Sequence, residues 1–286
     1  MNKKYIFFIF LLIFLQLSIG ICSKGEWIET LEDNSTWINW TKYTLYTELN
    51  GTSSELYPDY INLKRQKIHL MNKLYNSTLN FEIKKGIQIG KLLNKNGRKL
   101  LWELINNSSD NYMIKTSTNS YRIIMGLKLL GPLMKQVLSI SFILKEPDVF
   151  LNNLKNEDYI KGYTSVVIEV STDQFKPSMF IYIYSKNGEL LFSPKLMDYD
   201  ILINKGMAIY LTELNTNNRI GSHPLFLHAD SIYNQNEHSL VLDENSDFYL
   251  KFENVIKLLK KGKLVISKKR YSTLNQDEVN EFNIEN

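Results

Sequence analysis

Histidine and carboxylate side chains that could do chemistry gather late in the chain. Only four histidines are present, and three of them fall between positions 223 and 238. On a strand, His228 and Asp230 would project from one face, because side chains alternate, and His223 would approach from the preceding loop. Imidazole and carboxylate groups bind zinc and related metals, so a hydrolase or metal-dependent enzyme using these three residues is one hypothesis. The spacing matches no established metal motif, and a solvent-facing strand also explains it.

The motifs of the common enzyme classes are missing from the sequence. It lacks Gly-x-Ser-x-Gly, His-Glu-x-x-His, the Walker loop and the calcium-loop pattern. The single cysteine, Cys22, falls in the N-terminal apolar region, so a Cys–His nucleophile is not expected. Asp198 and Asp200 could form a carboxylate pair, but such residues in a loop are more typical of a turn. The sequence therefore favours a protein that binds rather than catalyses, and no cofactor is expected.

Aromatic side chains form the first candidate binding surface. All four tryptophans lie in the first 102 positions, and two of them share a segment with two tyrosines: Trp37, Trp40, Tyr43 and Tyr46. Aromatic rings on a loop stack on sugar rings or anchor a protein partner. The same rings would be equally suited to filling one end of a sheet. We favour burial, and we keep the segment as the first place to look for a protein or glycan ligand.

A basic element near the end of the chain is the second candidate. Seven of the fourteen residues from 257 to 270 are Lys or Arg, among them Lys260, Lys261 and Lys263. Such an element could meet anionic lipid or a charged polymer, which leaves peripheral membrane contact open. A solvated helix end followed by an edge strand guarded by lysines explains it as well, and is favoured. The net charge of +4 over 286 residues is too weak to indicate nucleic acid.

Two helices and about ten short strands are expected to position these residues. Apolar stripes at helical spacing, with Ile68 and Met71 on one of them, predict a helix within residues 53–76. A second apolar face predicts a helix over 252–259 that ends at Gly262. The strands are predicted at 81–89, 100–104, 121–129, 137–144, 166–170, 179–184, 190–192, 207–211, 225–227, 239–242 and 264–266.

Two Asn-Gly pairs, at 96–97 and 187–188, are predicted to be hairpin turns, because both residues tolerate positive φ. Gly131-Pro132 is predicted to break the chain between strands. The fold class is therefore mainly β, with α+β as the alternative. We expect an antiparallel β-sandwich or two packed β lobes with two or three peripheral helices. The lobes would span 23–155 and 156–270, followed by a polar acidic tail over 271–286.

The N-terminus predicts export. Lys3 and Lys4 precede an unbroken apolar run over 5–15, which is too short for a typical span and typical of a signal peptide over 1–22. An uncleaved anchor is the alternative, and acylation of Cys22 is disfavoured because Ile21 precedes it. The mature protein would be periplasmic, on the cell surface or extracellular. Because Cys22 is the one cysteine in the sequence, the protein would fold in an oxidising compartment without an internal disulfide.

Six N-x-Ser/Thr sequons lie in the first half, at Asn34, Asn39, Asn50, Asn76, Asn106 and Asn107. Composition alone accounts for most of them, so a bacterial exported protein is favoured over a glycosylated eukaryotic or viral one. The function expected is an exported binding or interaction protein of the cell envelope or the extracellular space. Its ligand, partner and oligomeric state stay open.

Overall fold

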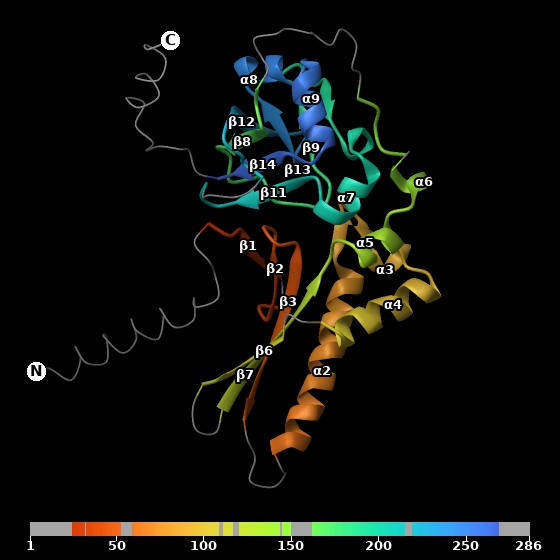
Figure 1. The fold of residues 1–286 in the computed structure, drawn as a ribbon. Helices are drawn as coiled ribbons and strands as arrows, with labels where there is room; N and C mark the ends of the chain where they lie inside the picture. Colours follow the sequence, from red (N-terminus) through yellow and green to blue (C-terminus); the bar gives the residue numbers. More distant parts are fainter. Residues whose placement is uncertain are drawn as a thin grey trace, which may run out of the picture.

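Two β-sheets organise the chain, and each is built from one continuous stretch of sequence (Figure 1). The computed structural model describes residues 25–31, 33–52, 59–108, 111–116, 120–143, 145–149, 162–214 and 219–268. The expected signal peptide (1–22), the boundary at 155/156 and the acidic tail (271–286) lie outside these ranges. Among the described helices, none combines the length and apolar character that crossing a membrane requires.

The N-terminal sheet has five antiparallel strands in the order β1-β2-β3-β7-β6. They are β1 (Ile28–Thr30), β2 (Thr36–Asn39), β3 (Thr44–Thr52), β6 (Asn111–Lys115) and β7 (Ser120–Lys128). The β3–β7 pair is the longest and runs from Thr44 opposite Lys128 to Thr52 opposite Ser120. The far end of this pair extends away from the seven-stranded sheet, together with β6 and the start of α2 (Asp59–Asn80) (Figure 1). We call this extension the arm and define it by residues 48–52, 62–70, 111–116 and 120–125.

Helix α2 covers one face of the N-terminal sheet. It packs against β3 and β7, and its Leu70, Met71 and Leu74 are buried, as the helical spacing predicted. Ile68 was expected on the same apolar side, but its side chain is 49% exposed. It lies in the first half of α2, in the arm, where fewer elements surround the helix (Figure 1).

Residues 81–106 are mostly helical, where the sequence predicted two strands and a turn. Short strands β4 (Glu82–Lys84) and β5 (Ile87–Gln88) are followed by α3 (Ile89–Leu92) and α4 (Lys95–Asn106). The hairpin turn predicted at Asn96-Gly97 is wrong, because the pair lies in the first turn of α4. The Asn94 side chain caps this helix and accepts a hydrogen bond of 2.9 Å from the Gly97 amide. Leu101 and Ile105 are buried at a spacing of four. Helical burial and the cap therefore override the spacing of two that predicted a strand over 100–104.

Asn94→Ala should lower the free energy of unfolding by about 1 kcal/mol, because the first turn of α4 loses its side-chain cap. The measurement is the urea midpoint, compared with that of Asn96→Ala, which changes an exposed side chain inside the same helix. Equal midpoints for the two variants would contradict the capping role.

The segment after Gly131 is also helical, so the strand predicted over 137–144 is wrong. Gly131 has a φ of 85° and is followed by α5 (Pro132–Val137) and α6 (Ile140–Ile143). Pro132 occupies the first turn of α5, where a missing amide costs nothing. The break predicted at Gly131-Pro132 is confirmed. The apolar run folds as a helix because α5 packs between α4 and α7 (Tyr199–Lys205).

The C-terminal sheet is mixed and has seven strands in the order β10-β9-β13-β12-β8-β14-β11. They are β8 (Ser165–Val170), β9 (Tyr182–Tyr184), β10 (Leu190–Phe192), β11 (Ala208–Leu211), β12 (Pro224–Tyr233), β13 (Asn236–Leu242) and β14 (Leu264–Ser267). The four strands β12, β8, β14 and β11 are parallel. The near-continuous apolar residues of β8, β14 and β11 fit strands that are buried on both faces. β12 instead alternates and keeps one exposed face. The hairpin predicted at Asn187-Gly188 is confirmed between β9 and β10.

Of the helices in the C-terminal lobe, only the last was predicted from the sequence. After a 3-10 turn (Pro194–Leu196) and α7 come α8 (Glu244–Tyr249) and α9 (Glu253–Lys260). The predicted closing unit of helix, glycine and strand is confirmed. Gly262 has a φ of 67°, and a Cβ there would lie 2.7 Å from Ile201 Cγ2, so both backbone and space require glycine.

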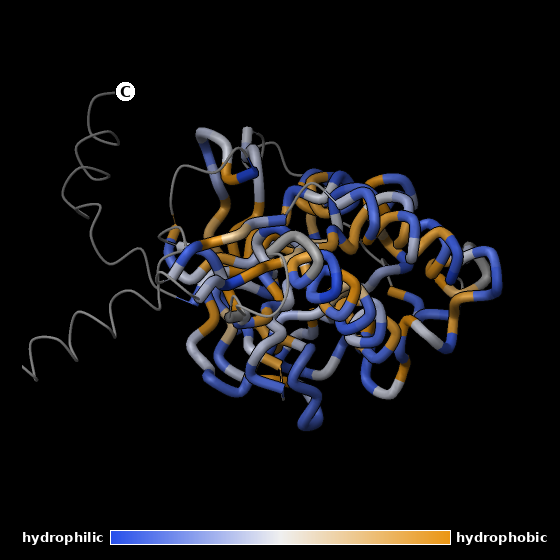
Figure 2. The backbone as a smooth tube through the Cα atoms, turned by 90° about the horizontal axis from the view of Figure 1, so that it is seen from below, coloured by the Kyte–Doolittle hydropathy of each residue, from blue (hydrophilic) through white to orange (hydrophobic). Residues whose placement is uncertain are grey.

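The fold class expected from the sequence is confirmed in its α+β form, with two large sheets, the two-stranded sheet of β4 and β5, and several helices. Antiparallel pairing holds throughout the N-terminal sheet, whereas the C-terminal sheet also contains parallel pairs. One apolar core runs through both lobes, and Figure 2 shows hydrophobic segments gathered inside with hydrophilic turns around them. At the junction, Tyr210 packs its ring against Trp40 and Tyr43 from the N-terminal lobe.

Candidate ligand-binding site

A cleft of about 930 Å³ opens where the two lobes meet. One wall comes from β1, β2 and the turn between them, and a second comes from the last half of α2. The C-terminal lobe supplies the third wall, from residues 176–178 and the start of β13. The lining combines amides, hydroxyls and charged groups with a floor that includes Trp40 and Phe81. Clefts between lobes are common places for small ligands.

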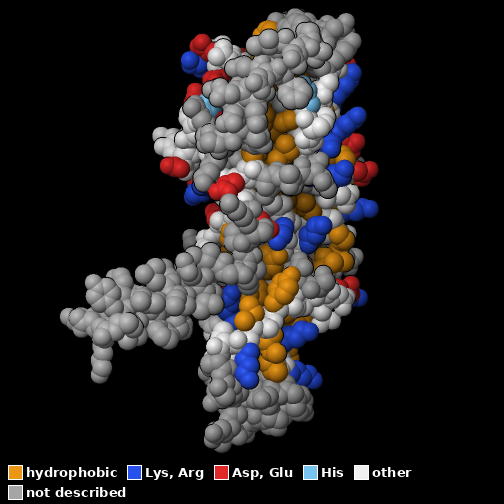
Figure 3. Space-filling model, turned by 60° about the vertical axis from the view of Figure 1, so that its left-hand side comes forward, with side chains coloured by type: hydrophobic (Ala, Val, Ile, Leu, Met, Phe, Trp, Pro, Cys, Tyr) orange, Lys and Arg blue, Asp and Glu red, His pale blue; other side chains and the backbone are white. Residues whose placement is uncertain are grey.

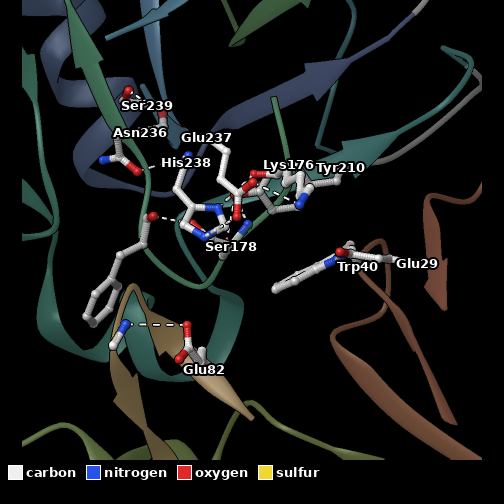
Figure 4. Close-up of polar contacts among 12 residues, drawn as sticks. Glu29, Trp40, Glu82, Lys176, Ser178, Tyr210, Asn236, Glu237, His238 and Ser239 are labelled. Atoms are coloured by element: carbon white, nitrogen blue, oxygen red, sulfur yellow. Dashed lines mark hydrogen bonds and ion pairs between the residues drawn. The ribbon is translucent and has the colours of Figure 1, made fainter. Parts of the chain in front are cut away.

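An ion pair and a histidine form the wall on the C-terminal lobe. Lys176 Nζ lies 2.8 Å from Glu237 Oε2, and the His238 ring contacts the Lys176 carbonyl through Nδ1 at 3.1 Å. Figure 4 shows these three side chains together, with Trp40 and Glu29 from the N-terminal sheet to one side. The hydrogen bond from Lys176 lowers the pKa of Glu237 and in turn raises the pKa of Lys176. Both groups are therefore charged at neutral pH.

Two acceptors are held in place on the N-terminal wall. The indole Nε1 of Trp40 donates to Glu29 Oε2 at 2.8 Å. Asp33 accepts from the Thr36 hydroxyl at 2.7 Å and lies 3.3 Å from Lys73 Nζ. Burial alone would raise the pKa of Asp33, but the hydrogen bonds from Thr36 and Lys73 outweigh it and lower that pKa. Both carboxylates, those of Glu29 and Asp33, are therefore held in position by protein donors before any ligand arrives.

The charge of the lining is negative. Four carboxylates line the cleft and only two lysines, Lys73 and Lys176, accompany them; the carboxylates are Glu29, Asp33, Glu82 and Glu237. Around them lie side-chain amides that both donate and accept, namely Asn72, Asn76, Asn80 and Gln88. Fixed acceptors next to amides suit a ligand that carries several hydroxyl or amino groups. A strongly anionic ligand would meet repulsion.

Ser178 and His238, which both line the cleft, are not paired as a nucleophile and base for acyl transfer. His238 Nε2 lies 3.8 Å from Glu237 Oε1, while its other ring nitrogen faces a backbone carbonyl. The Ser178 hydroxyl donates to the Phe180 carbonyl within its own loop. A nucleophile needs hydrogen-bond contact with its base, and these contacts hold Ser178 and His238 in separate interactions.

Of the three residues in the metal-site hypothesis, the structure brings only His228 and Asp230 together. His228 Nε2 lies 3.1 Å from Asp230 Oδ1 on the exposed face of β12, as alternation along the strand predicted. His223 instead stacks on Tyr163, with ring centroids 5.1 Å apart. The two histidines are five residues apart along extended chain, which separates them by about 16 Å. Within the described ranges, no three His, Cys, Asp or Glu side chains gather in a way that could hold a metal ion.

The aromatic segment forms a hairpin, with Trp37 on β2, Tyr46 on β3, and Trp40 and Tyr43 in the turn between them. Trp40 and Tyr43 are buried in the shared core. Trp37 and Tyr46 are a cross-strand pair between β2 and β3, half-buried and stacked at 5.6 Å. The burial that we favoured is therefore correct for Trp40 and Tyr43. Trp40 still bears on the site, because it lines the cleft and orients Glu29.

The basic element is a helix end followed by an internal strand. Lys260 and Lys261 are exposed at the end of α9, and Lys263 is partly exposed. The edge strand expected after them is wrong, because β14 lies between β8 and β11.

The predicted turn role is confirmed for Asp198, which caps α7 by accepting from the amides of Asp200 and Ile201.

Sequence reasoning missed most of the cleft. Glu29, Lys176 and Glu237 carry no motif, and they come from three separate parts of the chain. The one local signal is the Glu237-His238 pair near the start of β13, since adjacent titratable groups are worth inspection. His238 was grouped with His228 by sequence distance, but it faces a different part of the molecule.

Comparison with known protein families matches the C-terminal part of the chain. Residues 165–270 match the family model described as the second domain of Tp0624 from Treponema pallidum. The match begins at the first residue of β8 and ends just after β14, so it covers the whole seven-stranded sheet. It covers well under half of the chain and leaves out the N-terminal lobe. No curated protein matches the chain.

Proposed function

We propose that the protein is an exported binding protein that holds a small, hydroxyl-rich or amino-bearing ligand, such as an oligosaccharide, in the cleft between its lobes. The observation that carries this proposal is the cleft itself, with acceptors pre-set on two walls by Trp40, Thr36 and Lys176. Preorganised polar groups reduce the entropy lost on binding. The match to a domain from Treponema pallidum, a bacterium, supports the bacterial alternative over a eukaryotic or viral one.

The excess of carboxylates in the cleft should favour neutral and amino-bearing sugars over acidic ones. Neutral and amino-bearing oligosaccharides present donors to Glu29 and Glu237, and an ammonium group adds a charge-assisted hydrogen bond. Uronic-acid oligomers present carboxylates to the same wall, so they should bind more weakly than neutral sugars of equal length.

The test is calorimetric titration of the full chain with glucosamine, N-acetylglucosamine and galacturonic-acid oligomers of equal length. We expect affinity in the order glucosamine, N-acetylglucosamine, galacturonate. Glu237→Gln should weaken glucosamine-oligomer binding by about tenfold, because one charge-assisted hydrogen bond is lost. Glu103→Gln is the matched control, since Glu103 is exposed on α4, outside the cleft lining. Absence of binding by all three probes, or equal loss in both variants, would contradict the proposal.

A further inference from the structure

The arm presents apolar side chains to solvent on an open sheet edge. β6 is the last strand of the N-terminal sheet, and all five of its residues are exposed. Tyr112, Met113 and Ile114 are 47%, 61% and 39% exposed, and they follow one another in sequence. They are half of the large apolar side chains that are exposed in the described part of the chain. Three such residues in a row on an edge strand indicate an interaction surface, since natural edges are normally blunted.

The same arm is basic. Among its described side chains, the exposed charged ones are Lys64, Arg65, Lys67 and Lys115. The carboxylate of Glu48 is only partly exposed and lies 3.4 Å from Arg122 Nε. Figure 3 shows hydrophobic side chains gathered over the lower part of the molecule, with Lys and Arg on both sides. The surface therefore combines apolar burial with positive charge.

The positive charge and the apolar side chains of the arm distinguish between three possible partners: a second copy of the chain, a soluble polyanion and an anionic bilayer. Pairing of two β6 strands from two copies of the chain would bring two basic arms together, which costs electrostatic free energy. A soluble polyanion would satisfy the lysines but would offer nothing apolar to Met113 and Ile114. A bilayer with anionic headgroups satisfies both, because apolar side chains enter the interface while lysines remain at the headgroups.

We propose that the arm docks on an anionic membrane surface, with Tyr112, Met113 and Ile114 entering the headgroup region and Lys64, Lys67 and Lys115 at its phosphates. The cleft lies at the junction of the lobes, at the base of the arm (Figure 1). Docking through Tyr112, Met113 and Ile114 of β6 therefore holds the cleft away from the bilayer. This proposal is independent of which ligand the cleft binds.

Co-sedimentation with vesicles tests the proposal on the full chain. The vesicles are pure phosphatidylcholine or equal parts of phosphatidylcholine and phosphatidylglycerol. We expect binding to the anionic vesicles, weakening as ionic strength rises from about 0.1 M to about 1 M. Lys64→Gln/Lys67→Gln/Lys115→Gln should weaken binding by about 100-fold, at about fivefold per charge. Met113→Ser/Ile114→Ser should weaken it by about tenfold.

Two control variants separate the arm from the rest of the surface. Phe226→Ser removes an apolar side chain that is 44% exposed on β12, in the other lobe. Lys260→Gln/Lys261→Gln removes charge from the end of α9. Both should leave vesicle binding unchanged, and far-UV circular dichroism should show that every variant is folded.

Several results would overturn the proposal. Failure of the parent chain to bind anionic vesicles would do so, and a dimer seen by light scattering in that case would identify a second copy as the occupant. Binding that is lost with Lys260→Gln/Lys261→Gln instead would move the contact to α9. Heparin binding as tight as vesicle binding, and insensitive to Met113→Ser/Ile114→Ser, would identify a polyanion.

Discussion

Glu146→Ala should lower the free energy of unfolding by about 3 kcal/mol, the largest effect that we expect from a single charged residue. Glu146 has a side chain that is only 4% exposed, and Lys84 Nζ contacts both of its oxygens at 3.0 and 2.9 Å. The Tyr182 hydroxyl donates to the same carboxylate. Alanine would leave both donors without their acceptor, and a buried donor left unsatisfied is costly. This cluster ties β4 to β9 in the other lobe, so the loss falls on the junction.

Urea unfolding followed by circular dichroism measures this effect. Glu146→Gln should cost less than Glu146→Ala, because the amide oxygen still accepts from Tyr182. Glu103→Gln is the exposed control, since its carboxylate is 3.8 Å from Lys99 and contributes about 0.3–0.5 kcal/mol. If Glu146→Ala unfolded at the same urea concentration as Glu103→Gln, the cluster would not stabilise the junction.

The second large effect is a loss of stability in alkali. Burial raises the pKa of Tyr43, Tyr182 and Tyr210 above the usual value of 10. A raised pKa means that the unfolded chain gives up these protons first. The stability from the neutral phenols is therefore complete below pH 10 and falls as the pH rises above 10. Each tyrosine contributes a slope of about 1.4 kcal/mol per pH unit, so the three together contribute about 4.

Tyr43→Phe isolates one of these slopes. The variant should lose about 1 kcal/mol near neutral pH, because the Tyr43 hydroxyl donates to the Ala208 carbonyl at 2.7 Å. Above pH 10 its free energy of unfolding should fall less steeply than that of the parent, by about 1.4 kcal/mol per pH unit. Tyr112→Phe, an exposed substitution in the arm, should keep the parent slope. Parallel slopes for Tyr43→Phe and the parent between pH 10 and about 12 would contradict the assignment.

Local signals predicted the elements whose context is local. The Asn187-Gly188 hairpin and the unit from α9 to β14 follow from turn and cap chemistry, and both are confirmed. The hairpin predicted at Asn96-Gly97 is wrong because Asn and Gly occur both in hairpin turns and at the start of helices. The burial of Leu101 and Ile105 decides in favour of the helix. The strand predicted over 137–144 is wrong for a similar reason, since the packing of α5 depends on α4 and α7, which are distant in sequence.

The cleft was beyond local reasoning because its walls meet only in the folded chain. Glu29 is oriented in the cleft by a hydrogen bond from Trp40, and Lys176 is oriented by its ion pair with Glu237. The first pair is eleven residues apart, but nothing in the sequence places it opposite the second. Histidine spacing pointed to His223 and His228 because it counts positions only. In the fold His228 lies on β12 beside Asp230, whereas His223 precedes that strand and stacks on Tyr163.

The aromatic junction has a consequence for any protein that carries the C-terminal domain alone. Tyr210 and Phe175 lie in the matched domain, and here Trp27 packs edge-on against both rings. Gly206 admits the Tyr43 ring, because a Cβ there would lie 2.9 Å from Tyr43 Cζ. A relative that carries this domain without the N-terminal lobe must cover the same two rings with another segment or replace them with polar residues. Such relatives should therefore show coordinated substitutions at the positions equivalent to 175, 206 and 210, while the parallel strands keep their apolar pattern.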